Sequence, residues 1–243
     1  MITTARSLPS PVQSAALRYG LHMRLHLLNQ ALLWSHPRER ALYRKYRGRT
    51  MIPQHLFIDN LRVAALVRSV RGAIVECGTW RGGMIAALAE ALPKREYLLF
   101  DSFEGLPPAQ DIDGPWAREW QANPNAPNNH NNCTASEAEA RQSMAMAGVE
   151  ARFVKGWFAD TLPSFAAEKP RIALLRLDGD WYESTLTCLR FLFPLVPSGG
   201  VVIIDDYGSF DGCTRAVHDY LSQVGSVEAI RRSLRGVPFI VRR

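Results

Sequence analysis

Short apolar runs alternate with segments of helical periodicity from residue 73 onward. Runs of this length predict buried strands, whereas the other segments space their apolar residues as an amphipathic helix does. The predicted strands are Ala73–Cys77, Tyr97–Phe100, Arg152–Val154, Ile172–Leu177 and Val201–Ile204. The predicted helices lie near residues 84–92, 135–147, 161–168, 182–193 and 213–223.

This alternation predicts an α/β fold. Near-continuous apolar strands that alternate with helices are typical of a parallel sheet covered on both faces. Two further strands, Val227–Arg232 and Val237–Val241, flank Gly236 and predict a terminal hairpin. We therefore expect a mostly parallel, seven-stranded sheet with an antiparallel edge. Ligands of such sheets bind at the carboxyl ends of the strands.

The N-terminal part of the chain is predicted to be helical. Leucines at helical spacing predict a helix from Pro11 to Trp34, and Pro37 ends it. Arg38–Arg47 predicts a second, basic helix, and Gln54–Val70 predicts a third. The leucine stripe of the first helix needs cover, which favours a homodimer formed through these helices.

Positive charge is concentrated in the same region. Residues 1–50 carry nine Lys and Arg against one acid, Glu39, whereas the rest of the chain has 20 basic and 22 acidic residues. We therefore divide the chain into a basic helical arm, 1–48, and a domain, 49–243. A basic helical face exposed to solvent explains the positive charge of the arm, and a targeting or membrane-surface role is the alternative. The domain lacks the basic face of a nucleic-acid enzyme.

Composition excludes several classes of protein. A chain that is 47% hydrophobic and 21% charged is neither disordered nor fibrous. The longest apolar run, Met84–Ala89, is far shorter than the roughly 20 residues of a membrane span, so no transmembrane helix is expected. The four cysteines show no zinc-site spacing, which favours reduced thiols and a cytoplasmic protein.

Residues 111–134 interrupt the alternation. The segment is rich in Asn and Pro and contains Trp116 and Trp120. A long loop inside a compact domain is usually a functional lid or a disordered insert. Two indoles favour the lid, because a fully solvated loop has no use for them.

The first two strands end in residues suited to a nucleoside-containing cofactor. The first runs into a turn, Glu76–Gly83, that contains Gly78, Gly82 and Gly83. Glycines there allow the backbone to approach a ligand and to turn into a helix. An acid about 20 residues beyond such a turn commonly accepts ribose hydroxyls, and Asp101 has that position. Capping of a helix is the alternative for Asp101.

Acidic residues follow two later strands. Asp178 and Asp180 come after Ile172–Leu177, and Asp205 and Asp206 come after Val201–Ile204. If these parallel strands are neighbours, the four carboxylates converge and need a cation. Oxygen ligands without His or Cys suit Mg²⁺, Mn²⁺ or Ca²⁺ rather than zinc. The alternative is that Asp180 and Asp205 only cap the helices that follow.

Five segments resemble, in this order, motifs of the macrocin O-methyltransferase family: ECGTWRGG, DSFEGLP, GWFADTLP, LDGDWYEST and IIDDY. Thr50–Ile52 and Asp59–Leu61 also resemble the N-terminal cofactor segment of that family. The resemblance covers roughly residues 50–221. It implies a Rossmann-like class I fold and transfer of a methyl group from S-adenosylmethionine to a sugar hydroxyl of an antibiotic.

The resemblance also implies roles for residues at matching positions. The turn after the first strand would line the methionine end of the cofactor, Asp101 would hold the ribose, and residues 156–158 would border the adenine. The implied cofactor-binding residues are Thr50, Met51, Glu76, Gly78, Thr79, Trp80, Arg81, Asp101, Ser102, Phe103, Gly156, Trp157, Phe158 and Asp178.

The resemblance further implies that Asp178, Asp205 and Asp206 bind Mg²⁺ and that Asp180 is the general base. His130 in the lid is a second candidate base, and a salt bridge from Arg176 to a nearby acid would change the charge that a metal meets. We expect a small-molecule hydroxyl acceptor. A catechol or phenol acceptor uses the same chemistry and is the alternative. An RNA methyltransferase is less expected, because the excess positive charge lies only on the arm.

Overall fold

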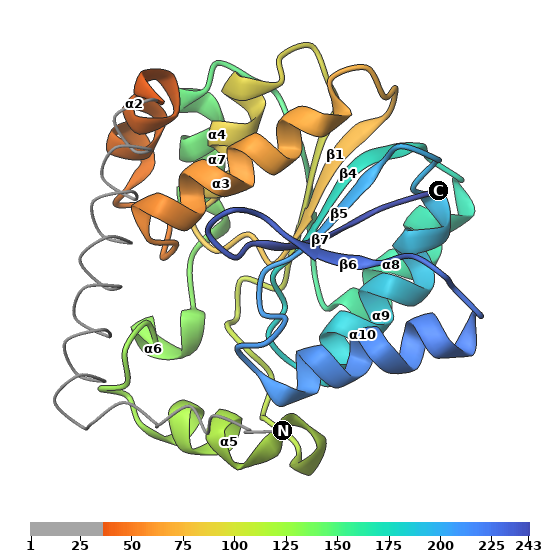
Figure 1. Cartoon of the computed structure of the whole chain (residues 1–243). Helices are drawn as coiled ribbons and strands as arrows, with labels where there is room; N and C mark the ends of the chain where they lie inside the picture. The colour runs from red at the N-terminus through yellow and green to blue at the C-terminus, as the bar shows by residue number, and fades with distance from the viewer. Residues whose placement is uncertain (1–35) are drawn as a thin grey trace, which may run out of the picture.

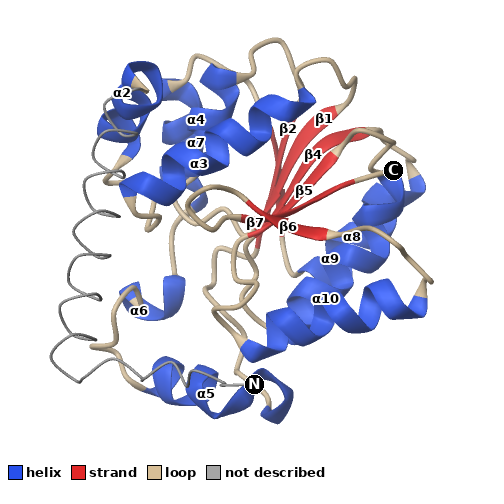
Figure 2. Cartoon of the chain, viewed as in Figure 1, coloured by secondary structure: helices blue, strands red, loops and turns tan. Residues whose placement is uncertain are grey.

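The computed structural model describes residues 36–243, and a seven-stranded sheet forms its centre (Figure 2). The strand order is β3-β2-β1-β4-β5-β7-β6. The strands are β1 Ala73–Cys77, β2 Tyr97–Asp101, β3 Arg152–Lys155, β4 Ile172–Leu177, β5 Val201–Ile204, β6 Ile230–Arg232 and β7 Pro238–Val241.

Strands β1 to β5 are parallel, and the hairpin of β6 and β7 adds an antiparallel edge beside β5. The predicted α/β class, the parallel sheet and the terminal hairpin are confirmed. The first hairpin strand is shorter than the predicted Val227–Arg232. The strand order reverses between β1 and β4, and such a switch point is where these sheets bind ligands.

Helices cover both faces of the sheet (Figure 1). The α-helices are α2 Pro37–Tyr46, α3 Gln54–Ala64, α4 Gly83–Ala91, α5 Gly114–Ala122, α6 His130–Cys133, α7 Glu137–Met146, α8 Phe158–Ala167, α9 Tyr182–Leu192 and α10 Asp211–Gln223. Three short 3₁₀ helices are η1 Ala65–Val67, η2 Asp111–Asp113 and η3 Phe193–Leu195.

Two large hydrophobic clusters of the described residues lie one on each face of the sheet, and Ala117, Trp120 and Trp181 form a third, smaller one. Helices α2, α3, α4 and α7 pack on one face, and α8, α9 and α10 pack on the other. Successive residues of β5 alternate between them, with Val201 and Ile203 in the first cluster and Val202 and Ile204 in the second. Burial on both faces explains why the strand sequences are almost continuously apolar.

The segment 111–134, predicted as a loop, contains η2, α5 and α6 in the structure. Helical order follows from local chemistry that the Asn and Pro content obscured. Pro115 occupies the first turn of α5, where its missing N–H is not needed, and Ala117 and Trp120 form the buried face of that helix. The segment is therefore a helical insert in which α5 is regular, whereas α6 is a single turn with positive φ at all four residues.

The N-terminal predictions are tested only in part. The predicted helix 38–47 is α2, and the predicted helix 54–70 is α3 followed by η1. The predicted helix Pro11–Trp34, its leucine stripe and most of the arm 1–48 lie outside the described residues. None of the described helices is both long and apolar enough to cross a membrane.

Candidate active site

A cavity of about 850 Å³ opens at the carboxyl ends of the parallel strands. The residues that follow β1, β2, β4 and β5 line it, so every predicted strand-end motif reaches the same space. The segment before α3, helix α5 and the turn between β6 and β7 complete its walls. Its size suits a cofactor together with a second small molecule.

The turn after β1 is built on close backbone approaches. Gly78 has a φ of 84°, and a Cβ added there would lie 1.7 Å from the carbonyl oxygen of Asp178. The N–H of Gly83 donates to the carbonyl oxygen of Arg49 at 2.9 Å, and a Cβ at Gly83 would lie 2.3 Å from that oxygen. Only glycine permits both contacts. They fix the turn against β4 and against the segment before α3.

Asp101 holds this turn in place. One carboxylate oxygen accepts the N–H groups of Thr79 and Trp80 at 2.7 and 2.8 Å, and the other accepts the N–H of Phe103 at 2.7 Å. Burial raises the pKa of Asp101, and the three N–H donors act in the opposite direction. The sequence suggested a ribose acceptor, and it did not indicate this structural role.

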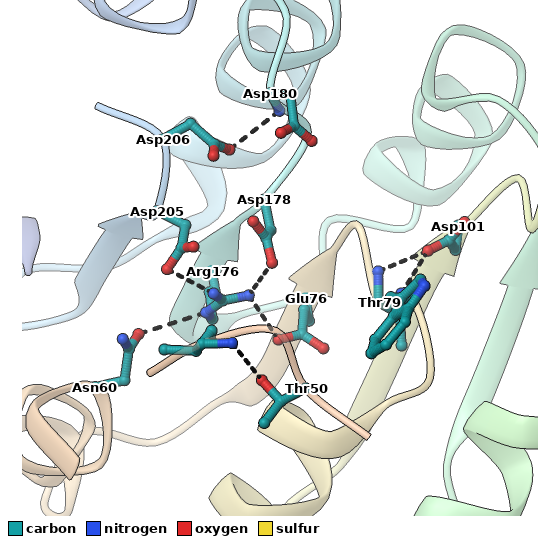
Figure 3. Close-up of polar contacts among 12 residues, drawn as sticks. Thr50, Asn60, Glu76, Thr79, Asp101, Arg176, Asp178, Asp180, Asp205 and Asp206 are labelled. Atoms are coloured by element: carbon teal, nitrogen blue, oxygen red, sulfur yellow. Dashed lines mark hydrogen bonds and ion pairs between the residues drawn. The ribbon is translucent and has the colours of Figure 1, made fainter. Parts of the chain in front are cut away.

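Arg176 forms the centre of a buried ionic network (Figure 3). Its Nη1 lies 3.0 Å from Glu76 Oε1 and 2.7 Å from Asp178 Oδ2, and its Nη2 lies 2.6 Å from Asp205 Oδ1. Its Nε donates to Asn60 Oδ1 at 3.4 Å. Glu76 and Arg176 are also partners in the register of β1 and β4. One guanidinium therefore binds acids from three adjacent strands.

Three of the four predicted acids meet as a candidate metal site. One carboxylate oxygen each of Asp178, Asp205 and Asp206 lies within 4.8 Å of the others. Arg176 contacts one oxygen of Asp178 and one of Asp205, which leaves the second oxygen of each for another partner. Asp206 Oδ2 accepts the N–H of Asp180 at 3.1 Å. This bond brings Asp180 beside the cluster with a φ of 57°.

The network leaves an excess of negative charge. Seven acids among the described residues line the cavity, Glu76, Asp101, Asp178, Asp180, Glu183, Asp205 and Asp206, against four arginines, Arg49, Arg176, Arg232 and Arg235. Burial raises the pKa of Glu76 to about 8, while Arg176 acts to lower it. Burial and then the neighbouring carboxylates raise the pKa of Asp180 and of Asp206. A cation placed here would relieve this repulsion.

Most of the predicted cofactor residues line the cavity, but two do not. Phe103 packs into the core beside β2, and Arg81 points to Glu139, with its Nε 3.0 Å from Oε1. His130 packs against the indole of Trp80, with ring centroids 5.5 Å apart, and is absent from the cavity lining. The residues that do line it are Thr50, Met51, Glu76, Gly78, Thr79, Trp80, Asp101, Ser102, Gly156, Trp157, Phe158 and Asp178.

The sequence did not indicate the wall formed by the turn between β6 and β7. Arg232 and Arg235 line the cavity there, and Arg235 is held by Asp59 of α3, with its Nη1 2.8 Å from Oδ1. The predicted hairpin already contained the information needed to place this turn at the cavity. Because β7 runs antiparallel to β5, the beginning of β7 lies at the carboxyl end of β5.

Comparison with known proteins identifies the family. A family model described as Macrocin-O-methyltransferase (TylF) matches residues 14–233. The 8-demethyl-8-(2,3-dimethoxy-alpha-L-rhamnosyl)-tetracenomycin-C 4'-O-methyltransferase of Streptomyces olivaceus is 40% identical over 185 residues, which are 71% of this chain and 68% of that protein. The chain belongs to the macrocin O-methyltransferase family. It is accordingly an S-adenosylmethionine-dependent O-methyltransferase.

Other relatives of this methyltransferase are O-methyltransferases as well. Mycinamicin III 3''-O-methyltransferase of Micromonospora griseorubida is 34% identical over 183 residues, 72% of this chain and 70% of that protein. The solved structure of the O-methyltransferase NovP is 30% identical, with a TM-score of 0.66 over 80% of this chain and 82% of that one. The likeness confirms the class I fold expected from the motifs.

The glycine-rich turn of the methyltransferase fits the cofactor. Glu76 Oε2 and Thr79 Oγ1 are buried without a hydrogen-bond partner, and both residues line the cavity. Buried polar atoms without partners are costly, so such atoms in a cavity indicate a ligand that supplies the missing bonds. The amino acid and ribose portions of S-adenosylmethionine carry the required donors and acceptors.

Replacing Asp101 by Ala is expected to weaken S-adenosylmethionine binding. The variant loses the predicted acceptor of the ribose hydroxyls and also the bonds that hold Thr79 and Trp80, each charge-assisted bond being worth about 1.5–3 kcal/mol. Calorimetric titration measures the affinity, and Glu104→Ala, at an exposed position three residues away, is the matched control. An unchanged affinity in the Asp101 variant would remove this residue from the cofactor site.

Proposed function

We propose that this methyltransferase transfers a methyl group to a sugar hydroxyl of a glycosylated small molecule and that it requires Mg²⁺. The observation that carries the proposal is the convergence of Asp178, Asp205 and Asp206, within 4.8 Å of one another, on a cavity shared with the cofactor residues. The names of two relatives support the acceptor class, since one acts on a rhamnosyl tetracenomycin and the other on mycinamicin III.

The donor set fits a hard divalent cation. Its atoms are carboxylate oxygens with no His or Cys among them, which suits Mg²⁺ or Mn²⁺. Asp178, Asp205 and Asp206 would hold the ion, and Arg176 already compensates part of their charge. A bound Mg²⁺ supplies Lewis-acid chemistry that lowers the pKa of an acceptor hydroxyl.

Asp180 is the residue that we assign as the general base. It lines the same cavity and makes no contact with Arg176, unlike Asp178 and Asp205. Its backbone N–H is fixed by Asp206, so its position is set by the same cluster that would hold the metal. A carboxylate there removes the proton of the acceptor hydroxyl as the oxygen attacks the methyl carbon.

The remaining residues orient the two reactants. Glu76, the glycine-rich turn and Asp101 would hold S-adenosylmethionine, whose sulfonium supplies an already activated methyl group. Because the methyl needs no activation by the protein, alignment of the acceptor oxygen with the sulfur–methyl bond is the main requirement. The helical insert 111–134 forms part of the wall that excludes water from this space.

An acceptor screen with methyl-labelled S-adenosylmethionine tests the proposal. Glycosylated and catechol-type acceptors are each incubated with Mg²⁺ and with EDTA. We expect label on a sugar hydroxyl with Mg²⁺ and none with EDTA. Label on catechols alone would favour the second acceptor class. Full transfer in EDTA would show that the acidic cluster has no catalytic metal.

The homodimer and the cytoplasmic location stay predictions. The leucine stripe that favours a dimer falls outside the described residues. Sedimentation equilibrium of the full chain and of a chain lacking residues 1–35 measures the dimer directly. Nucleic acid is not the acceptor we propose, since the domain after residue 50 carries 20 basic and 22 acidic residues.

A further inference from the structure

Helix α5 presents two tryptophans in opposite surroundings. Trp120 is 7% exposed, whereas Trp116, one helical turn earlier, is 57% exposed. Both line the cavity that contains the acidic cluster. Single exposed apolar side chains such as Leu66 and Val227 are ordinary on a protein surface, but an exposed indole in the lining of a ligand cavity offers a ring face to the ligand.

The buried tryptophan fixes α5 to the segment that carries the acids. Trp120 packs edge-on against Trp181 and Phe210, with ring centroids 6.2 and 5.8 Å apart, and the other two rings are 4.9 Å apart. The polar edges of both indoles are satisfied by carbonyl oxygens, Trp120 Nε1 by Pro127 at 2.9 Å and Trp181 Nε1 by Pro107 at 2.8 Å. Such a cluster has little freedom to rearrange.

A second attachment comes from Asp113, which directly precedes α5. Its buried Oδ1 accepts the N–H of Tyr182, the first residue of α9, at 2.7 Å. Gly212 of α10 packs so closely that an added Cβ would lie 2.2 Å from the same oxygen. Figure 1 shows α5 beside the beginning of α10. Helix α5 is thus attached to the start of α9, two residues after Asp180.

We propose that the exposed indole of Trp116 is the stacking platform for the sugar ring of the acceptor, which rests on the proposed function. The face of an indole is electron-rich and attracts the polarised C–H groups on one face of a pyranose. The hydroxyls at the ring edge remain free to reach the carboxylates. Because α5 is fixed to the start of α9, a ring stacked on Trp116 has a defined place relative to Asp180.

Steady-state kinetics on Trp116→Ala and Trp116→Phe test this assignment with a glycosylated acceptor that the wild type methylates. Loss of a platform of this area is expected to raise the acceptor KM roughly tenfold to hundredfold in Trp116→Ala. Trp116→Phe keeps a smaller ring, so its acceptor KM should lie between those of the wild type and Trp116→Ala. The cofactor KM should stay unchanged, since none of the residues assigned to the cofactor lies on α5.

Two control variants make the result specific. Leu234 is 70% exposed at the tip of the hairpin and does not line the cavity, so Leu234→Ala should behave as wild type. Trp157 is 38% exposed, lines the cavity and belongs to the segment assigned to the adenine, so Trp157→Ala should raise the cofactor KM instead.

An unchanged acceptor KM in Trp116→Ala overturns the inference while leaving the proposed function intact. A change of oligomeric state in that variant, measured by light scattering, also overturns it, because the indole then contacts a second copy. A wild-type enzyme that methylates no glycosylated acceptor overturns the proposed function itself, and the inference with it.

Discussion

Replacing Asp180 by Asn is expected to lower turnover about 10²–10⁴-fold, the usual contribution of a positioned base. Asn has the same shape and cannot take up the proton. The hydrogen bond from the backbone N–H of residue 180 to Asp206 does not depend on the side chain, so the local fold should persist. Cofactor affinity and metal affinity should stay close to wild type, which calorimetric titration measures.

Asp178→Asn separates the two roles. Asp178 belongs to the candidate metal cluster and binds Arg176, so this change should weaken metal binding and turnover together. Glu150→Gln, at an exposed position between α7 and β3, controls for loss of a carboxylate elsewhere. If Asp180→Asn loses the metal while Asp178→Asn keeps it, the roles are reversed. If Asp180→Asn stays fully active, the proton leaves by another route.

Replacing Arg176 by Met is expected to destabilise the protein by about 3–5 kcal/mol at neutral pH. The guanidinium is 1% exposed, and it contacts Glu76, Asp178 and Asp205. Met fills a similar volume without charge, so the buried Glu76 and the half-buried Asp178 and Asp205 lose their counter-ion. Denaturant unfolding measures the change, and Arg190→Met, on the exposed surface of α9, is the matched control.

The pH dependence of this effect has a defined sign. Without Arg176 the buried carboxyl groups have pKa values above those in the unfolded chain, as burial already causes for Glu76 and Asp178. Arg176 acts to lower both pKa values, so the folded variant takes up these protons at a higher pH than the folded wild type, in which the pKa of Glu76 is about 8. The variant therefore gains stability relative to wild type as pH falls from alkaline values toward about 8. The difference in the free energy of unfolding between Arg176→Met and wild type should therefore shrink as pH falls through this range.

A constant difference across that pH range would show that these carboxylates do not cause the loss. Equal stability of Arg176→Met and wild type at neutral pH would contradict the network. If the Met variant does not fold, Arg176→Lys keeps one positive charge but lacks the fork that reaches Asp178 and Asp205 together. The free energy of unfolding of Arg176→Lys should lie between that of the wild type and that expected for Arg176→Met.

The sheet and the meeting of the acids follow from local sequence patterns. Apolar runs place β1, β4 and β5 within a residue of their true bounds because both faces of these strands are buried. The strand-end rule then brings Asp178 and Asp205 together, since β4 and β5 are hydrogen-bonded neighbours. These features depend on periodicity and on topology alone.

Other features depend on three-dimensional neighbours that the sequence does not specify. The expected salt bridge from Arg176 to a nearby acid is confirmed for Asp178 and Asp205, but the sequence did not indicate the third partner, Glu76, 100 residues earlier in the chain. Asp101 was predicted for its separation from the glycine-rich turn, but its contacts to Thr79 and Trp80 follow from how that turn is folded. Distant partners of this kind leave no periodic signal.

The insert 111–134 shows a different limit of sequence patterns. Its Asn and Pro content suggested a loop, yet Trp120 packs on Trp181 and gives α5 a tertiary reason to form. Tertiary packing of one apolar face outweighs weak local helix propensity. The tryptophans favoured a lid, which stays a prediction. The structure places Trp116 and Trp120 in the lining of the cavity, and the sequence did not indicate the helix that carries them.

Titration of the chain with Mn²⁺, followed by electron paramagnetic resonance, tests the metal-assisted site most directly. We predict one bound ion per wild-type chain and markedly weaker binding in Asp205→Asn and in Asp206→Asn, because each removes a charged oxygen ligand. Glu150→Gln should bind as wild type does. Absence of a bound ion in the wild type, or equal binding in all four proteins, would contradict the account.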